Sequence, residues 1–399
     1  MFDTMRKYLW VIKAISKLRL STQKEVITNF LTAEKKYVPD NTKADVSDIL
    51  KCALCPNMCR FDCPVLQATK SETYSPAGKA RIAYFLEMGR FTSDDAVDLM
   101  YACAGCSACQ RWCPFNFSVE DLLTGVRKDI IGKGLVPSAL MSLKENLVKN
   151  HTIYEGGTTS LGLTPRKADI LYFAGCTTLN KTRKVADATL KILEKAGINF
   201  TALPEEWCCG APLSILGFDK DFKKFAKHNT KMFKEEGYKT IVCSCPECAY
   251  IFKEVYPLIG LKMDADIVHT SQFLLTLVKE GKITLKERKE ECVYHDPCAL
   301  ARRLHIYEEP RALLKYIPGL TLNEAQFTKE ETRCCGMGGI LNVTNPEISL
   351  SITKTRSSEL QKASPCVVTA CPTCEVAFKR VDNYEVLDIS ELVLKFLEE

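Results

Sequence analysis

Residues 103–114 read CAGCSACQRWCP, and residues 52–64 read CALCPNMCRFDCP. Each run ends with a cysteine followed directly by proline. The first run has the spacing C-x2-C-x2-C-x3-C-P, and the second has one extra residue in its middle gap. Thiolates at these spacings reach three corners of one iron–sulfur cube from a single turn, while the fourth cysteine serves a neighbouring cube. The two runs therefore predict two cubane [4Fe-4S] clusters.

The pattern assigns eight cysteines to two crossed sets. The first set is Cys52, Cys55, Cys59 and Cys113. The second set is Cys63, Cys103, Cys106 and Cys109. A zinc ribbon is the alternative, but zinc sites do not use four cysteines followed by proline twice. We therefore expect iron–sulfur clusters at both sets.

The composition of the whole chain fits this assignment. It has 21 cysteines in 399 residues, which is an odd number in a chain much longer than a disulfide-stapled secreted module. Lys13 and Lys17 interrupt the apolar stretch near the N-terminus, and no run approaches the roughly 20 apolar residues of a membrane span. The net charge of +5 is too mild to predict nucleic-acid binding. We expect a cytoplasmic chain whose cysteines are metal ligands.

The stretch between the two cysteine runs indicates a helical scaffold. Residues 76–90 and 93–101 predict helices, the second with Asp94 and Asp95 near its start. Two such runs on helices resemble the α-helical ferredoxin domain found in the iron–sulfur protein of succinate dehydrogenase and in the C subunit of heterodisulfide reductase. We assign residues 46–150 to this domain. The resemblance implies a relay that passes one electron at a time.

Residues 1–45 precede this domain and contain no cysteine. Within residues 1–20, apolar side chains such as Ile12 lie beside basic side chains such as Lys13. This pattern predicts a basic amphipathic helix. Such a helix either packs against the ferredoxin domain or docks to a membrane subunit or another partner.

The second half of the chain contains an internal repeat. One set is Cys176, Cys208, Cys209, Cys245 and Cys248. The other is Cys298, Cys334, Cys335, Cys371 and Cys374. Cys208 and Cys334 are 126 residues apart, as are Cys245 and Cys371, so the two sets predict a duplicated unit.

Local patterns repeat together with these cysteines. Short apolar stretches at residues 170–175 and 292–295 precede the first cysteine of each set, and those at 240–245 and 366–371 run into the fourth. Helical patterns alternate with them, which predicts two small α/β units with parallel sheets, at residues 166–282 and 288–399. The cysteines then lie at the carboxyl ends of strands, where such sheets place ligands.

Glycines follow the paired cysteines of each set. Gly210 follows the first pair and Gly336 the second, with Gly338 and Gly339 close behind. Because glycine has no side chain, its backbone can approach a bulky inorganic group closely. We predict that Gly210 and Gly336 help to bind the cofactor.

Two such five-cysteine sets are similar to the CCG signatures in the B subunit of heterodisulfide reductase. A dicluster ferredoxin domain in front of them resembles the D subunit, so the multidomain fold expected is a helical ferredoxin domain followed by two CCG domains. The resemblance implies that each five-cysteine set holds a noncubane [4Fe-4S] cluster. It also implies that a small-molecule disulfide, such as the coenzyme M–coenzyme B heterodisulfide, is reduced between them. Reduction of a disulfide needs two electrons, and the cubanes deliver one each.

Two alternatives remain open at this point. CCG units also occur in electron-transfer subunits of glycerol-3-phosphate, lactate and glycolate oxidising systems, which reduce no disulfide. A CCG set can also hold zinc or another cluster. On either function the chain needs an electron-donating partner, a membrane cytochrome b protein or a flavoprotein, and this partner could hold it at the cytoplasmic face of a membrane.

Several residues outside the two signatures complete the predicted site. His295 lies three residues before Cys298 and is the candidate catalytic acid, with support of the cluster as its other role. Asp296 is expected to cap a helix that starts at Pro297. The remaining cysteines are expected to be buried in strands, where free cysteine packs as a small apolar residue: Cys243, Cys292 and Cys366.

Overall fold

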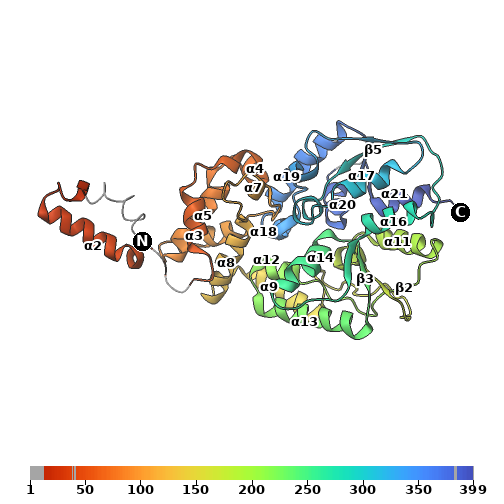
Figure 1. The fold of residues 1–399 in the computed structure, drawn as a ribbon, viewed down its shortest axis with the longest axis horizontal. Coiled ribbons are helices and arrows are strands. Elements are labelled where there is room, and N and C mark those ends of the chain that lie inside the picture. Colours follow the sequence, from red (N-terminus) through yellow and green to blue (C-terminus); the bar gives the residue numbers. More distant parts are fainter. Residues whose placement is uncertain (1–12, 38, 40–41, 382–383, 399) are drawn as a thin grey trace.

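The computed structural model describes residues 13–37, 39, 42–381 and 384–398. Figure 1 shows helix α2 (Leu20–Tyr37) apart from the rest of the protein. Leu20 and Leu31 on this helix are exposed. The amphipathic helix predicted over residues 1–20 lies largely outside the described residues, and the described long helix begins at its C-terminal end.

The ferredoxin domain is a cluster of helices around two short cysteine-bearing turns. Side-chain caps explain where several helices begin: Asp45, Ser75, Ser93 and Ser118 each accept a hydrogen bond from a backbone N–H of the first turn. The helices are α3 (Val46–Leu54), η1 (Met58–Asp62), α4 (Pro64–Thr69), η2 (Glu72–Tyr74), α5 (Pro76–Glu87), α6 (Asp94–Tyr101), α7 (Ala108–Arg111), α8 (Val119–Gly132) and α9 (Ser138–Asn150).

The first CCG domain contains a four-stranded parallel sheet in the order β2-β1-β3-β4. Its strands are β1 (Ile170–Phe173), β2 (Phe200–Thr201), β3 (Thr240–Cys243) and β4 (Asp266–His269). Its helices are α10 (Cys176–Asn180), α11 (Arg183–Lys195), α12 (Ala211–Leu216), α13 (Asp219–Glu236), α14 (Pro246–Tyr250), η3 (Ile251–Val255), α15 (Tyr256–Leu258) and α16 (Thr270–Lys279).

The second CCG domain repeats this topology, with the parallel order β6-β5-β7-β8. Its strands are β5 (Glu290–His295), β6 (Leu320–Asn323), β7 (Cys366–Thr369) and β8 (Glu385–Asp388). Its helices are η4 (Ala299–Arg303), α17 (Glu308–Lys315), η5 (Lys329–Glu331), η6 (Gly338–Ile340), α18 (Leu341–Thr344), α19 (Pro346–Gln361), α20 (Pro372–Lys379) and α21 (Ile389–Phe396). The fold class predicted from the sequence is confirmed.

The two CCG domains share one hydrophobic core. Leu193 on α11 and Leu274 on α16 belong to the same buried cluster as Leu313 on α17 and Leu392 on α21. This packing turns the two units toward each other, as the green and blue parts of Figure 1 show. The carboxyl ends of both sheets therefore approach a common interior, which is where the cysteine sets begin.

Candidate metal centres and the cavity between the repeats

The first crossed set lies around a small internal space in the ferredoxin domain. Four of its lining residues are the predicted ligands, brought together from the two sequence runs: Cys52, Cys55, Cys59 and Cys113. Trp112 and Phe117 close the same space. Cys109 also borders it, from the side of the neighbouring set.

The second crossed set surrounds an adjacent space. Its lining includes the other four predicted ligands: Cys63, Cys103, Cys106 and Cys109. Lys79, which is buried, and Glu120 lie at the same space. The structure thus groups each fourth cysteine with the other run, which is the crossed pattern expected from the spacing.

The chemistry of these thiols suits an iron–sulfur cube. Burial, and to a smaller extent the neighbouring cysteines, raises the pKa of Cys52 to about 12 and that of Cys59 to about 11. Several thiolates would repel one another in such a space without positive iron. Among the described residues, no group of three or more His, Cys, Asp or Glu side chains is placed to bind a single metal ion. The ligands of a cube need not converge on a single metal ion, because each cysteine binds a different iron atom.

Between the two CCG domains lies a cavity of about 520 Å³, called here the CCG cavity. Nine of the ten signature cysteines line it: Cys176, Cys208, Cys209, Cys245, Cys248, Cys298, Cys335, Cys371 and Cys374. Most sit just beyond strand ends, since Cys176 follows β1 and Cys371 follows β7 by a few residues. The carboxyl-end placement predicted from the sequence is therefore observed, and both repeats face one chamber.

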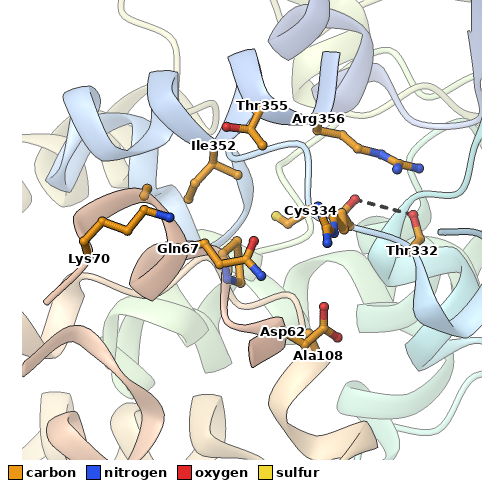
Figure 2. Close-up of a pocket in the computed structure, with 12 residues that line it drawn as sticks. Asp62, Gln67, Lys70, Ala108, Thr332, Cys334, Ile352, Thr355 and Arg356 are labelled. Carbon is orange, nitrogen blue, oxygen red and sulfur yellow. Dashed lines mark hydrogen bonds between the residues drawn. The ribbon is translucent and has the colours of Figure 1, made fainter. Parts of the chain in front are cut away.

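The tenth signature cysteine, Cys334, lines a second cavity of about 380 Å³, called here the interface cavity. This cavity lies between α4 of the ferredoxin domain and α19 of the second CCG domain. Figure 2 shows Cys334 near its centre, with Asp62 on the ferredoxin side and Ile352 on the CCG side. Cys334 is thus placed at the junction of the two domains.

Interactions between thiols link the cysteine sets to one another. Cys106 of the ferredoxin domain interacts with Cys334 of the second CCG domain. Cys371 of the second CCG domain interacts with Cys245 of the first. Within the first CCG set, the sulfurs of Cys176 and Cys208 are 3.9 Å apart. These contacts form a series from the ferredoxin domain to both CCG sets.

Gly210 and Gly336 are required for reasons of backbone packing. Their φ values are +84° and +93°, in the region that favours glycine. A Cβ on Gly210 would lie 2.9 Å from the ring of Phe222, and one on Gly336 would lie 2.5 Å from the carbonyl of Ser349. Neither glycine is among the described residues that line the CCG cavity. Cofactor binding by these two glycines remains a prediction, and their observed contacts are with α13 and α19.

The glycine that does approach a signature thiol is Gly175. Its φ is +83°, and a Cβ there would lie 3.3 Å from the sulfur of Cys248. Gly338 and Gly339 approach the ferredoxin domain instead. A Cβ on Gly339 would lie 2.1 Å from the carbonyl oxygen of Cys103, and one on Gly338 would lie 2.4 Å from that of Ala104. These two glycines let the second CCG domain touch the cysteine-bearing turn.

His295 lies at the end of β5 and is buried, with 1% of its surface exposed. Its ring meets the ring of Phe378 edge to face, and Nε of Arg356 lies 3.4 Å from its Nδ1. Burial lowers the pKa of His295 well below its usual value, and the nearby arginine charges add to this effect. The ring is not among the described residues lining the CCG cavity. Proton donation by His295 stays a prediction that this placement does not favour.

Asp296 was expected to cap a helix at Pro297, but this expectation is wrong. Both of its carboxylate oxygens accept hydrogen bonds from Arg311, each at 2.7 Å. Oδ2 also accepts from the backbone N–H of Lys329 at 2.8 Å. Its chemistry is that of a buried ion pair. The three cysteines outside the signatures are buried in β3, β5 and β7, as predicted: Cys243, Cys292 and Cys366.

Several residues that line the CCG cavity are outside the sequence motifs. Tyr154 comes from the stretch after α9, Lys181 follows α10, and Arg380 follows α20. Glu247 lies between Cys245 and Cys248 of the first set, so its position inside the motif could have identified it as a candidate. Arg303 carried no such signal, because it lies five residues beyond Cys298 at the end of η4.

Comparison with known proteins agrees with this architecture. Residues 48–117 match the family described as a 4Fe-4S dicluster domain. Residues 170–253 and 292–379 each match the family described as a cysteine-rich domain, CCG. A hypothetical protein from Helicobacter pylori has a similar structure, with a TM-score of 0.54 at 12% identity over 100% of this chain and 76% of that one. That likeness concerns the fold alone.

Curated relatives add names to the similarity. The D subunit of the dihydromethanophenazine:CoB–CoM heterodisulfide reductase of Methanosarcina acetivorans is 31% identical over 312 residues, covering 74% of this chain and 76% of the relative. The B subunit of the fumarate reductase (CoM/CoB) of Methanothermobacter marburgensis is 26% identical, covering 91% and 76%. The EtfAB:quinone oxidoreductase of Syntrophomonas wolfei is 27% identical, covering 75% and 47%.

No helix in the described part of the chain is long and apolar enough to cross a bilayer. The two CCG domains, the dicluster domain and the identity to the Methanosarcina relative lead to one assignment. The chain is an iron–sulfur oxidoreductase that belongs to the family of heterodisulfide reductase D subunits.

Proposed function

We propose that this chain reduces a small-molecule disulfide in the CCG cavity, with the coenzyme M–coenzyme B heterodisulfide as the first candidate. The reaction balances as RSSR′ + 2 e⁻ + 2 H⁺ → RSH + R′SH. The observation that carries the proposal is that signature cysteines of both repeats line one cavity. Two electron-delivering sites that face the same disulfide suit a reaction that separates two sulfurs.

Clusters bound by the four cysteine sets would supply single electrons and iron atoms with affinity for sulfur. We infer two cubanes in the ferredoxin domain and one noncubane cluster at each CCG set, with the 18 cysteines of the four sets as ligands. The thiol contacts support an order of transfer. Cys106 and Cys334 join the ferredoxin domain to the second CCG set, and Cys371 and Cys245 join the second set to the first.

The residues around the cavity would bind the substrate and limit its contact with water. Ile153, Pro212 and Val343 offer apolar contact for the carbon chains of the substrate. Lys181 and Arg380 place positive charge at the same chamber, one from each repeat. A disulfide with an acidic group would find a charged partner there.

A purified chain, kept anaerobic, tests the proposal with reduced methyl viologen as a one-electron donor. Free thiols formed from the heterodisulfide are measured. Cys208→Ala and Cys334→Ala should each abolish thiol formation, because each disrupts one of the two sites. Cys243→Ala is the matched control, since this buried cysteine belongs to neither signature, and it should retain activity.

The similarity to the EtfAB:quinone oxidoreductase supports a second candidate function. In that case the chain would relay electrons between a flavoprotein and another acceptor without reducing a disulfide. A chain with full iron content that oxidises a reduced flavoprotein partner, yet forms no thiol from the heterodisulfide, would favour the relay. On the first function, the donor would be a membrane cytochrome b protein or a flavoprotein.

A further inference from the structure

Two consecutive arginines connect the second CCG domain to the ferredoxin domain. Arg302 and Arg303 end helix η4, a π-helix. Nη1 of Arg302 donates to the carbonyl of Cys106 at 2.8 Å, and Nη2 of Arg303 donates to the carbonyl of Gly105. Both acceptors belong to the turn that carries the second crossed cysteine set. The two arginines therefore bind the backbone of the ferredoxin domain at Cys106, a predicted cluster ligand, and at the residue before it.

The charge of Arg303 is neutralised by two carboxylates. Nη2 pairs with Glu120 of the ferredoxin domain, and Nη1 pairs with Glu247 of the first CCG domain at 2.9 Å. The side chain is about 10% exposed. Arg303 thus holds three domains together as an ion-pair junction, and the two carboxylates compensate its positive charge.

Arg302 has a different environment. It is 9% exposed, and its other donors reach the carbonyls of Glu330, at 2.8 Å, and Thr332. Among the described residues, no carboxylate lies within ion-pair distance of its guanidinium. Asp62 interacts with this charge only at longer range, and its carboxylate accepts a hydrogen bond from Nε1 of Trp112, at 3.0 Å. Within the described part of the chain, Arg302 is therefore a buried cation whose hydrogen-bond acceptors are all carbonyl oxygens.

A buried cation is costly unless a negative group compensates it. A candidate for such a group is the thiol of Cys106, because Arg302 interacts with it and also binds the carbonyl of the same residue. Arg302 is bonded to the carbonyl of Cys106 at 2.8 Å, so its charge lies close to this predicted ligand. An iron–sulfur cube held by four thiolates carries net negative charge, and that charge grows when the cube accepts an electron.

We propose that Arg302 is a positioning residue that stabilises the reduced form of the cluster held by Cys63, Cys103, Cys106 and Cys109. Each reduction adds one electron beside a fixed positive charge, so the reduction potential of this cluster is raised and electrons are drawn toward the second CCG domain. The inference rests on the proposed function only in requiring a [4Fe-4S] cluster at this set.

Redox titration of the intact, iron-loaded chain tests the proposal, with each ferredoxin cluster followed by its electron paramagnetic resonance signal. Cys55→Ser and Cys103→Ser assign the two signals to the two sets. Arg302→Gln removes the charge and keeps a donor for the Cys106 carbonyl. At a fixed potential, we expect the reduced-to-oxidised ratio of the second-set cluster to fall about tenfold. For one electron, this corresponds to a reduction potential that is lower by about 59 mV.

Two further variants separate charge from hydrogen bonding. Arg302→Lys keeps the charge and should hold this ratio within about threefold of the wild-type value. Arg81→Gln is the matched control, because Nε of Arg81 donates to the carbonyl of Ala53 at 2.9 Å, beside the first set. Since Arg81 is exposed, its replacement should cause a smaller change, and only in the first-set cluster.

An unchanged second-set ratio in Arg302→Gln with full iron content would overturn the proposal. If Arg302→Gln loses that cluster, the ratio measured in Arg302→Lys tests the role of the charge instead. A Lys variant that keeps the cluster and its ratio supports the role of charge, and one that keeps the cluster with a tenfold lower ratio contradicts it. The disulfide assay on the same samples is independent, because a wild-type chain that forms no thiol overturns the proposed function and leaves the comparison of ratios valid.

Discussion

The thiol of Cys106 interacts with the thiol of Cys334, although the two residues belong to different domains. Cys106 lies in the crossed sets of the ferredoxin domain, and Cys334 begins the paired cysteines of the second CCG set. The second set in turn meets the first, where Cys371 interacts with Cys245. These relationships are the basis for the proposed order of transfer, from the ferredoxin domain through the second repeat to the first.

The crossed grouping predicts which cysteine variants share a phenotype. Cys113→Ser should remove the same cluster signal as Cys55→Ser, because both residues border one space. Cys109→Ser should instead match Cys63→Ser, because both residues line the second space, although Cys109 also borders the first space and is close to Cys113 in sequence. Low-temperature electron paramagnetic resonance with iron analysis checks this. Loss of one common signal in Cys109→Ser and Cys113→Ser would contradict the crossed assignment.

Gly339 predicts a change in transfer between domains. A Cβ at this position would lie 2.1 Å from the carbonyl oxygen of Cys103, so Gly339→Ala should push the second CCG domain away from the ferredoxin turn. We expect electron transfer to the CCG clusters to slow about tenfold or more, because small displacements at a reacting site can cost large factors in rate. Stopped-flow reduction of the intact chain measures it.

Gly134→Ala is the matched control for Gly339→Ala. Gly134 has φ +70°, close to the +63° of Gly339, so both substitutions strain the backbone similarly. A Cβ on Gly134 has no atom within 4 Å, so the domain contact stays intact. Equal slowing in both variants would show that backbone strain, and not the domain contact, is responsible.

The sequence allowed the architecture and the ligand sets to be predicted, but not the junctions between domains. The cysteine spacing depends on local backbone geometry. The crossed sets, and the strand ends at which the CCG cysteines lie, could therefore be predicted from the sequence. β2 and β6 were missed because Phe200–Thr201 and Leu320–Asn323 carry little periodic signal. Arg302 could not be identified, since its acceptor on Cys106 is 196 residues away in sequence. Such contacts depend on the tertiary fold.

The ion pair of Asp296 and Arg311 predicts a large effect on stability. Asp296 is 1% exposed and binds the guanidinium through two hydrogen bonds of 2.7 Å. Asp296→Asn leaves the arginine without its buried charge partner, although the more exposed Glu324 remains at 2.7 Å. We expect the free energy of unfolding to fall by about 3 kcal/mol, as for a broken buried pair. Anaerobic urea denaturation followed by circular dichroism measures the loss.

Asp187→Asn provides the exposed counterpart. Asp187 pairs with Arg183 at 3.1 Å, and both side chains are more than two-fifths exposed. Because water screens such a pair, this variant should lose no more than about 0.5 kcal/mol. Similar losses in Asp296→Asn and Asp187→Asn would show that burial of the Asp296 pair contributes little.

The dependence of stability on pH can be predicted at Asp388, the N-cap of α21. Burial raises the pKa of this carboxyl to about 7 in the folded protein, far above its ordinary value of 3.8. The folded state therefore retains a proton that the unfolded chain has already released, and the contribution of Asp388 to stability falls as the pH rises from about 4 to about 7. Above that range it stays constant. The wild type should lose stability across this window relative to a variant that cannot ionise.

Asp388→Asn is that variant, and asparagine can still accept the hydrogen bond that Ser390 donates to the cap at 2.8 Å. Other groups titrate in both proteins, so the difference between their unfolding free energies isolates Asp388. This difference should move in favour of the variant by on the order of 3 kcal/mol between pH 4 and pH 8, because each tenfold change in proton affinity is worth about 1.4 kcal/mol. Urea denaturation at four pH values measures it. A difference that stays constant or moves toward the wild type as the pH rises would mean that Asp388 is already ionised in the folded protein at low pH.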